Sequence, residues 1–478
     1  MIRKLKSAYG KMSDVARTSL WFTICNFLQR GTAFLTVPIF TRLLTSEEYG
    51  LCNVYFAWLE IFLLFTSLKI PYEGFQNGLI RNEGDKDGYT SSMLGLILVL
   101  TCLSAAVYAV FRRQINRLTG LDTLIMALMF LQLFFNSPLM LWTNRERFEF
   151  KYRWPVIVTV ISTAANPLIA VIALFHTVYR AQARIIASAL VQAVFGLIFT
   201  VVLFYRGRTF YRKEYWKFAL RFNLPLFFYY ASQVVLNQSD RIMINYYEGS
   251  GKAAIYSVAY SAATIMQLLV SAVNGSFQPW MYKKMKAKQY GEIRKTMSGL
   301  CLLVGAATLI MSAFAPDLVR IMATAEYSQA VWIIPPVASS VFFVFLYMLF
   351  ADVEMYYDEN RGIMAISIFC SGANVVLNAV FVLKYGYLAA GWTTLVCNML
   401  LALLHFVLMK RACRKNRMQE TVFSGKTILL LSAAVLVFTF LSLFMYRTRF
   451  LRYVILAAEA GMLFGFRKPL VEMLKRIK

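Results

Sequence analysis

The segment from Gln233 to Asn245 places amide and charged side chains where the surrounding sequence is apolar. Gln233, Asn237, Arg241 and Asn245 recur at four-residue steps and follow one face of a helix, with Asp240 beside them. A charge near the centre of a bilayer costs about 3 kcal/mol or more, so such residues face a protein partner or water. We expect this stripe to line a cavity, where its charges bind a polar group or hold a gate.

Two earlier segments carry polar residues of the same kind. Asn26 and Arg30 lie on a stripe in the first apolar run, and Glu60 lies within the second. Asp240 and Arg241 are adjacent and about 100° apart on a helix, so they are poorly placed to pair with each other. We predict Arg30 as the partner of Asp240 and Glu60 as the partner of Arg241. For the serines, threonines and asparagines, hydrogen bonding between packed helices is an equal alternative.

Residues that would support catalysis are scarce. The two histidines, His176 and His405, are expected at the membrane interface. The stretch SGKT at 424–427 ends like a phosphate-binding loop, but Glu420 stands where that loop requires glycine. No paired carboxylates or metal-ligand cluster stand out within an apolar run. The sequence therefore predicts no catalytic residue, no metal and no cofactor.

The composition is that of a protein that crosses the membrane many times. Hydrophobic residues make up 59% of the 478 residues and charged residues 15%, with a mean hydropathy of +0.57. Soluble domains average under half apolar and about a quarter charged. The net charge of +26 would suggest nucleic-acid binding in a soluble protein. Here the basic residues lie between apolar runs and act as topology signals, so no nucleic-acid partner is predicted.

A helix needs about 20 mostly apolar residues to cross a bilayer. Fourteen runs qualify, with the last the shortest and interrupted by Glu459. Their limits are 19–41, 50–68, 90–111, 121–143, 154–176, 182–205, 222–247, 254–280, 297–315, 329–351, 362–382, 386–409, 427–446 and 451–466.

The loops between these runs give an orientation. With the N-terminus inside, the inside segments hold about three times as many lysines and arginines as the outside ones. This count assigns Arg30 and Arg241 to spans and every other lysine and arginine to a loop or terminus. The asymmetry predicts a multi-pass protein of the cytoplasmic (inner) membrane with both termini in the cytoplasm.

The chain also contains an internal repeat. LLTSEEYGLCNVYFAWLEIFLLF (43–65) resembles NYYEGSGKAAIYSVAYSAATIMQLL (245–269), which is six spans later. Six is an even number, so the halves are parallel repeats, an architecture found in transporters. We predict an all-α membrane protein with two six-helix lobes and two further C-terminal helices. The predicted parts are an N-terminal lobe (1–205), a cytoplasmic linker (206–221), a C-terminal lobe (222–410), and the last two helices with a basic tail (411–478).

Three stretches together resemble a known family. They are RGTAFLTVPIFTRLLTSEEYGLCNVYF (30–56), QSDRIMINYY followed by IYSVAY (238–260), and ANVVLNAVFVLKYGYLAAGWTTL (373–395). In this order they are similar to the polysaccharide-unit flippases of the MOP exporter superfamily, of the O-antigen and capsule type. The resemblance weakens after about residue 410.

The resemblance implies a flippase that moves oligosaccharides linked through diphosphate to a polyprenol, by alternating access between two lobes. It implies contact with membrane lipids, and partners that could include other polysaccharide assembly proteins. Arg30, Asp240 and Arg241 match positions of the family's motifs, and Glu60, Lys69 and Arg81 lie where the family often has polar residues. Together with the polar stripes, this gives the predicted substrate-binding residues Arg30, Arg241, Asn26, Asn237, Lys69 and Arg81, and the predicted gating residues Asp240 and Glu60.

Two alternatives stay open at this point. A multidrug and toxin extrusion exporter shares the repeat architecture, but would have twelve spans and an acidic cavity. A membrane-bound glycan polymerase or acyltransferase is the other, and the scarcity of histidine and the short loops disfavour it.

Overall fold

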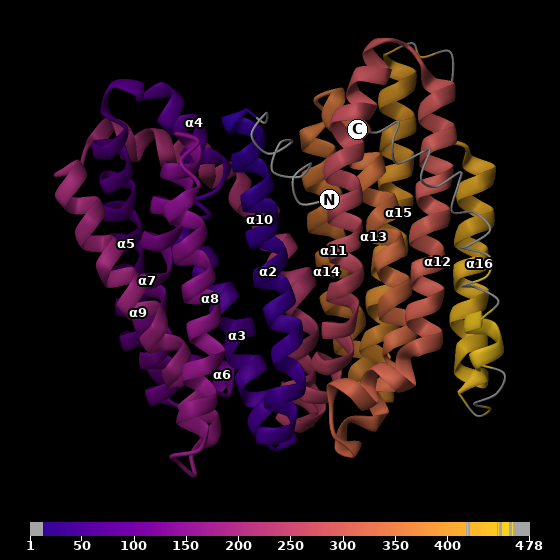
Figure 1. The fold of residues 1–478 in the computed structure, drawn as a ribbon, viewed down its shortest axis with the longest axis horizontal. Helices are drawn as coiled ribbons and strands as arrows, with labels where there is room; N and C mark the ends of the chain where they lie inside the picture. Colours follow the sequence, from indigo (N-terminus) through magenta and orange to yellow (C-terminus); the bar gives the residue numbers. More distant parts are fainter. Residues whose placement is uncertain are drawn as a thin grey trace, which may run out of the picture. The chain divides into compact units, whose positions relative to one another are not determined.

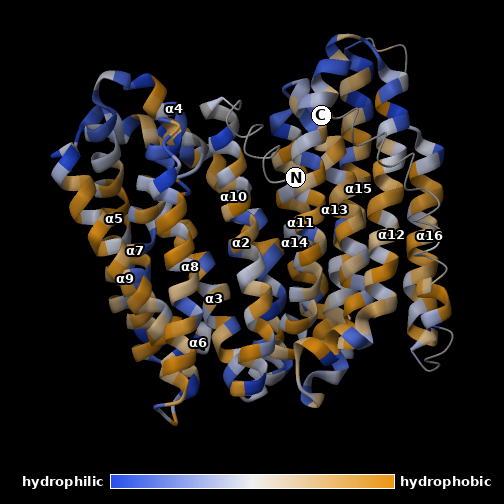
Figure 2. Cartoon of the chain, in the orientation of Figure 1, coloured by the Kyte–Doolittle hydropathy of each residue, from blue (hydrophilic) through white to orange (hydrophobic). Residues whose placement is uncertain are grey.

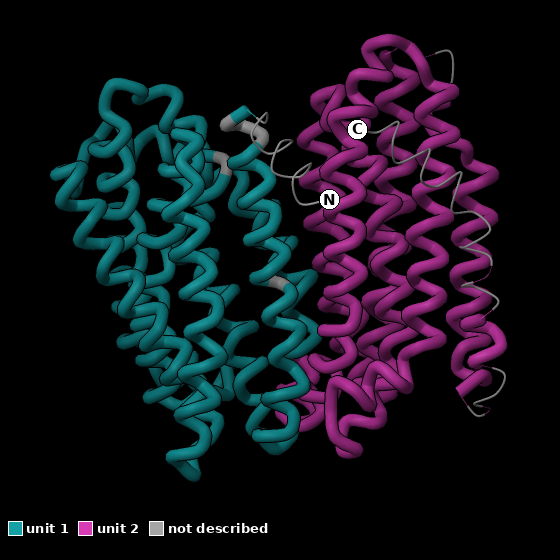
Figure 3. Tube along the Cα trace, in the orientation of Figure 1, with its two compact units in different colours: residues 1–242 teal, residues 243–478 magenta. Residues whose placement is uncertain are grey.

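The structure is a computed structural model that describes residues 13–416, 418, 421–446, 448, 452–457 and 461, without the side chains of 14–16, 30 and 73. Every regular element in these ranges is a helix, as predicted (Figure 1). Contacts between residues divide the chain into two units, Met1–Ile242 and Met243–Lys478 (Figure 3).

The first unit contains ten helices within its described residues, and the last turns of α10 belong to the second unit. They are α2 (Asp14–Leu43), α3 (Ser46–Ser67), α4 (Glu73–Arg81), η1 (Glu83–Asp85), α5 (Lys86–Val110), α6 (Arg112–Thr119), α7 (Thr123–Phe148), α8 (Arg153–Leu174), α9 (Arg180–Gly207) and α10 (Lys213–Glu248).

The second unit continues the series. Its described helices are α11 (Ser250–Lys286), α12 (Tyr290–Met322), η2 (Ala325–Trp332), α13 (Ile334–Tyr356), α14 (Asn360–Tyr385), α15 (Ala389–Lys415) and α16 (Gly425–Met445).

Thirteen of the fourteen predicted spans coincide with long helices, of 21 to 37 residues. The predicted span 451–466 lies mostly outside the described residues. α10 begins at Lys213, so the second half of the predicted linker 206–221 is helical. The predicted lobe boundaries themselves stay a prediction.

Local sequence explains where several helices begin. Thr45 caps α3: its hydroxyl accepts a hydrogen bond from Glu48 N at 3.2 Å, while the Glu48 carboxylate accepts one from Thr45 N at 2.9 Å. This reciprocal capping box satisfies two backbone donors that a helix start leaves unpaired. Asp122 caps α7 in a similar way, accepting from Ile125 N at 2.8 Å.

The core of the first unit lies between α5, α7 and α9. Trp142 of α7 and Phe199 of α9 are both buried, with ring centroids 4.3 Å apart. The start of α10 also packs on this core, because the Trp216 indole donates to the Ser92 carbonyl at 3.0 Å. The charged first turns of α10 are therefore held by the first unit.

In the second unit, α13 is the central helix. It is buried along most of its length and packs against α11, α12 and α15. Such a helix can be apolar all round, and any polar residue on it needs a partner inside the protein.

Eleven of the described helices are long and apolar enough to cross a membrane. Figure 2 shows hydrophobic residues along the middle of most long helices and hydrophilic residues at their ends. The two long helices outside this set are α2 and α10, which carry the polar stripes described above. A helix this polar is unsuited to contact lipid on all sides, so its stripe faces protein or water.

Candidate functional site

Two arginines act on the buried phenol of Tyr49, near the start of α3. Tyr49 is 2% exposed. The guanidinium of Arg184, from α9, lies over three aromatic rings, at 3.9 Å from the centroid of Phe40, 5.1 Å from Tyr49 and 5.8 Å from Phe56. Cation–π attraction to the ring faces therefore fixes this arginine in place. Its Nη1 is buried and makes no hydrogen bond within the described part of the chain.

A second arginine approaches the same phenol from α10. The charges of Arg184 and Arg241 both act on the Tyr49 hydroxyl. Arg241 donates to Gln238 Oε1 at 2.7 Å, which orients the guanidinium along its own helix. We call Tyr49, Arg184 and Arg241 the Tyr49 cluster. Two arginines beside one buried phenol create a positive site that favours an anion.

Asp240 precedes Arg241 in the sequence but points to a different face of α10. It is 1% exposed, whereas Arg241 is half-buried. The predicted partner Arg30 lies on α2, but its side chain falls outside the described residues, so that pairing stays a prediction.

The other predicted residues of the spans are more exposed. Glu60 is half-buried on α3 and forms no ion pair within the described residues, so the predicted pair with Arg241 is not observed. Asn26 of α2 is exposed, and exposed Asn237 donates to the Gln233 carbonyl of its own helix at 2.7 Å. Both amides remain accessible for binding.

Lys69 and Arg81 lie at the opposite end of the unit from the Tyr49 cluster. Lys69 is 9% exposed in the turn after α3, with its ammonium 4.9 Å from the Tyr72 ring. Arg81 ends α4 and lies 5.2 Å from the ring of Phe218, near the start of α10. At 1.5 Å per residue, Phe218 and Arg241 are separated by roughly 35 Å along α10. The structure therefore divides the predicted binding residues between two places.

Arg184 is the member of the cluster that sequence reasoning misses. It lies within the first turns of α9, where an arginine is easily counted as a loop charge. The available signal is its position inside the predicted span 182–205. The aromatic cage itself comes from α2 and α3, far away in sequence.

Ion pairs connect helix ends at the side of the first unit that the basic residues predict to be cytoplasmic. Glu149 accepts from the Lys86 ammonium at 2.8 Å and pairs with Arg145 at 3.1 Å. The hydrogen bond from Lys86, aided by the charge of Arg145, holds the pKa of Glu149 below its usual range. Glu146 is likewise held by Arg206 at 2.9 Å.

A polar cavity of about 540 Å³ lies beside this network. Because its two acids are already paired, its remaining charges are basic. The residues that line it include Arg17, Lys151, Arg153, Trp154, Glu146 and Glu149.

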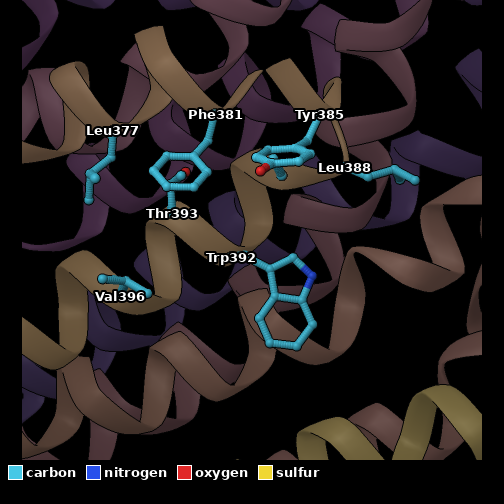
Figure 4. Close-up of a pocket in the computed structure, with 8 residues that line it drawn as sticks. Leu377, Phe381, Tyr385, Leu388, Trp392, Thr393 and Val396 are labelled. Carbon is cyan, nitrogen blue, oxygen red and sulfur yellow. The ribbon is translucent and has the colours of Figure 1, made fainter. Parts of the chain in front are cut away.

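A second cavity, of about 420 Å³, lies between α14 and α15 in the second unit and has no charged residue in its lining (Figure 4). Its walls are aromatic and aliphatic: Leu377, Phe381, Tyr385, Leu388, Trp392 and Val396. It suits apolar chains. Within the described residues, no group of three or more histidine, cysteine, aspartate or glutamate side chains could hold a metal ion.

Comparison with known proteins agrees with this architecture. Residues 15–285, more than half of the chain, match the model of the polysaccharide biosynthesis protein family. The Lsg locus putative protein 1 of Haemophilus influenzae is 23% identical over 372 residues, which cover 74% of this chain and 88% of that protein.

Two solved structures show the same fold. The lipid II flippase MurJ, in an inward closed conformation, aligns with a TM-score of 0.66 at 14% identity over 94% of this chain and 100% of its own. An inward-facing multidrug resistance MATE transporter of the MOP superfamily aligns with a TM-score of 0.63 at 14% identity, over 82% of this chain and 96% of its own. The protein therefore belongs to the polysaccharide biosynthesis protein family, with the all-helical fold that MurJ and the MATE transporters share, as the resemblance to the MOP polysaccharide flippases predicted.

Proposed function

We propose that the protein is a flippase that carries polyprenyl-diphosphate-linked oligosaccharide units from the inner to the outer leaflet of the cytoplasmic membrane. The two units would alternate between inward-open and outward-open states, and the product would serve cell-surface polysaccharide synthesis of the O-antigen or capsule type. Family membership and the likeness to a structure named as a lipid II flippase support this proposal.

The Tyr49 cluster is the observation that carries it. A diphosphate cannot cross hydrocarbon without a charged partner, because an ion in an apolar medium is very costly. Arg184 offers a buried donor without a hydrogen bond, and Arg241 adds a second positive charge at the same phenol. Guanidinium groups match the paired oxygens of phosphate better than any other side chain. An anion bound at Arg184 Nη1 would satisfy this donor, and the charge of Arg241 would add to the attraction.

The apolar cavity between α14 and α15 takes no part in holding the diphosphate, because its lining carries no charge. It is better suited to isoprenoid or acyl chains of the surrounding lipid. We assign the charged head of the cargo to the first unit for this reason.

A multidrug exporter remains the second candidate, because a MATE transporter shares the fold. The two candidate functions differ in the charge of the cargo. Arginines beside the site repel an organic cation, whereas they attract a diphosphate. A dye-efflux assay with ethidium distinguishes them: cells that express the protein should retain the dye as control cells do.

The decisive test is glycan export in a strain that lacks its own flippase. Arg241→Ala and Arg184→Ala should abolish export at matched protein levels, and Arg241→Lys should restore it only in part, because lysine lacks the forked donor. Arg113→Ala is the matched control: Arg113 is exposed on α6 of the same unit, away from the cluster. It should export normally.

A binding measurement separates loss of cargo from loss of motion. Removing a charge-assisted hydrogen bond costs about 1.5–3 kcal/mol, or roughly 10- to 100-fold in affinity. The purified Arg241→Ala protein should therefore bind a lipid-linked oligosaccharide at least about tenfold more weakly. Normal export by both alanine variants would show that the Tyr49 cluster is not the binding site.

A further inference from the structure

The second unit contains two carboxylates on its most buried helix. Asp352 is 4% exposed and Glu354 is 0% exposed, both near the end of α13. Residues two apart on a helix lie about 200° apart, so the two acids face opposite sides of α13. Asp352 faces α11, where the Gln278 amide donates to it at 2.6 Å. Glu354 faces α15.

Glu354 meets a histidine there. His405 Nδ1 lies 2.7 Å from Glu354 Oε2, and both side chains are 0% exposed. The Tyr347 ring covers the imidazole, with centroids 5.5 Å apart. The ring is enclosed between α13 and α15, so His405 is buried inside the protein, and its predicted depth at the membrane interface stays a prediction. His405 Nε2 makes no hydrogen bond within the described residues.

No basic residue balances these acids. Within the described part of the chain, neither Asp352 nor Glu354 forms an ion pair with lysine or arginine. If Glu354 is ionised and His405 is neutral, the pair carries one uncompensated negative charge in the protein interior, which is strongly unfavourable. One more proton, on either the ring or the carboxyl, makes the pair neutral overall. The geometry therefore favours a proton held between the two groups.

A metal ion fits this place poorly. Hard cations require a shell of several oxygen ligands, whereas the pair offers one carboxylate and an imidazole. A proton needs only the hydrogen bond that is present.

We propose that Glu354 and His405 form a proton-binding site of the second unit, which exchanges one proton with water at the predicted cytoplasmic end of α13. On release, the proton passes to water and leaves an ionised carboxylate beside a neutral ring. The path to water is short, because α13 ends at Tyr356. Just beyond this end, Glu359 at the start of α14 pairs with exposed Lys415 at 2.8 Å.

Two titratable groups act directly on the pair. The Tyr347 ring covers His405, and Glu359 acts on Glu354 through its charge, an effect that its pair with Lys415 weakens. Asp352 and Tyr282 lie on the α11 side of α13, and Tyr357 follows the end of α13.

The pair has a direct consequence for movement. Release of the proton would place a net charge between α13 and α15, the most extensively packed helices of the unit. We expect the rate of transport to follow the pH on the cytoplasmic side for this reason. This second step rests on the proposed function, whereas the proton site does not.

The chain suits a spectroscopic test because it has only two histidines. Isotope-labelled histidine in the full-length protein gives two ring signals, and exposed His176 serves as the internal reference. Nitrogen NMR detects the second ring proton that makes His405 cationic, and the infrared band of a protonated carboxyl detects a proton on Glu354. At about pH 6 we expect one of these two signals.

Matched isosteric variants complete the test. Glu354→Gln should remove that signal, because the amide cannot carry the charge that retains the proton, whereas Asp352→Asn, on the opposite face of α13, should leave it in place. A neutral ring together with an ionised carboxylate in the wild-type protein at about pH 6 would overturn the proposal. A His405 signal that Glu354→Gln leaves unchanged would also overturn the proposal. Both measurements require only that the variants fold.

The transport step is tested separately in proteoliposomes loaded with a lipid-linked oligosaccharide. The wild-type rate should change with the pH on the predicted cytoplasmic side, and the Glu354→Gln rate should not. A pH-independent wild-type rate would overturn the link to transport. Absence of any flipping would refute the proposed function and leave the spectroscopic result standing.

Discussion

Replacing Gly196 by alanine tests a close backbone contact between α9 and α7 in the first unit. A methyl group at this position of α9 would lie 2.7 Å from the Phe135 Cα of α7, and closer still to the Phe135 Cβ and carbonyl oxygen. Carbon atoms in contact ordinarily keep about 3.5–4.0 Å, so the two helices must separate by about 1 Å. Because backbone atoms are involved, no rotamer change relieves the clash.

The separation also affects a neighbouring hydrogen bond. Gln192, one turn earlier on the same face of α9, donates to the same Phe135 carbonyl at 2.9 Å. Overpacking costs about 1–3 kcal/mol, and weakening this bond adds about 0.5–1.5 kcal/mol. The change from glycine to alanine in a helix returns up to about 1 kcal/mol. With the full 1 kcal/mol returned, the net expectation is a loss of about 0.5–3.5 kcal/mol of stability.

Gly372→Ala is the matched control. Gly372 lies inside α14, and a methyl group there would meet nothing within 4 Å. The gain in helix propensity is the same in both variants, so their difference isolates the packing effect. Melting followed by tryptophan fluorescence in detergent should rank Gly372→Ala at or above wild type and Gly196→Ala below it. A Gly196→Ala protein that melts as high as the control would refute the packing argument.

Three further predictions concern topology, pH and gating. A single cysteine that replaces Lys286, on a background without the seven native cysteines, should not react with an impermeant thiol reagent in intact cells. Labelling from outside would contradict the predicted orientation. The hydrogen bond from Lys86 lowers the pKa of Glu149. The stability that this hydrogen bond gives the folded protein is therefore present above the ordinary carboxyl pKa, and it is lost as the pH falls through the lowered pKa of Glu149. Glu149→Gln should therefore lower the free energy of unfolding at neutral pH by up to about 1 kcal/mol, and this difference from wild type should vanish in acid. A difference that is the same at every pH would contradict this prediction. Asp240→Asn should impair transport but retain binding of the lipid-linked sugar. The accessibility of cysteines placed in the cavity should shift toward one face of the membrane, because loss of a buried charge changes the balance between the inward-open and outward-open states. Loss of binding with unchanged accessibility would instead assign Asp240 to the cargo site.

The long helices could be predicted because the bilayer imposes their length and apolar composition. The start of α10 could not, because Lys213 and its charged neighbours show no hydropathy signal. That end is helical in the structure, where Trp216 packs on α5. Hydropathy describes the contact with lipid, and this helix end contacts protein instead.

The candidate site was predictable in part. Arg241 and Asp240 stand out because charges are rare in spans. The role of Arg184 depends on rings from two other helices, and the pair of Glu354 and His405 joins residues 51 positions apart. Such contacts depend on how helices pack, and one sequence shows no pairing between distant positions.

The polarity of α2 and α10 bears on how the chain enters the membrane during synthesis. Each charge at the middle of a helix opposes insertion by about 2.5–3.5 kcal/mol, so neither helix partitions readily into lipid alone. Each is followed after a short turn by an apolar helix, α3 or α11, and the turn before α3 is fixed by the capping box of Thr45 and Glu48. We therefore expect α2 with α3, and α10 with α11, to insert as helical hairpins, in which the apolar helix carries the polar one across. The same polar residues that we propose as a pathway for cargo would thus make the order of membrane integration depend on the helix that follows.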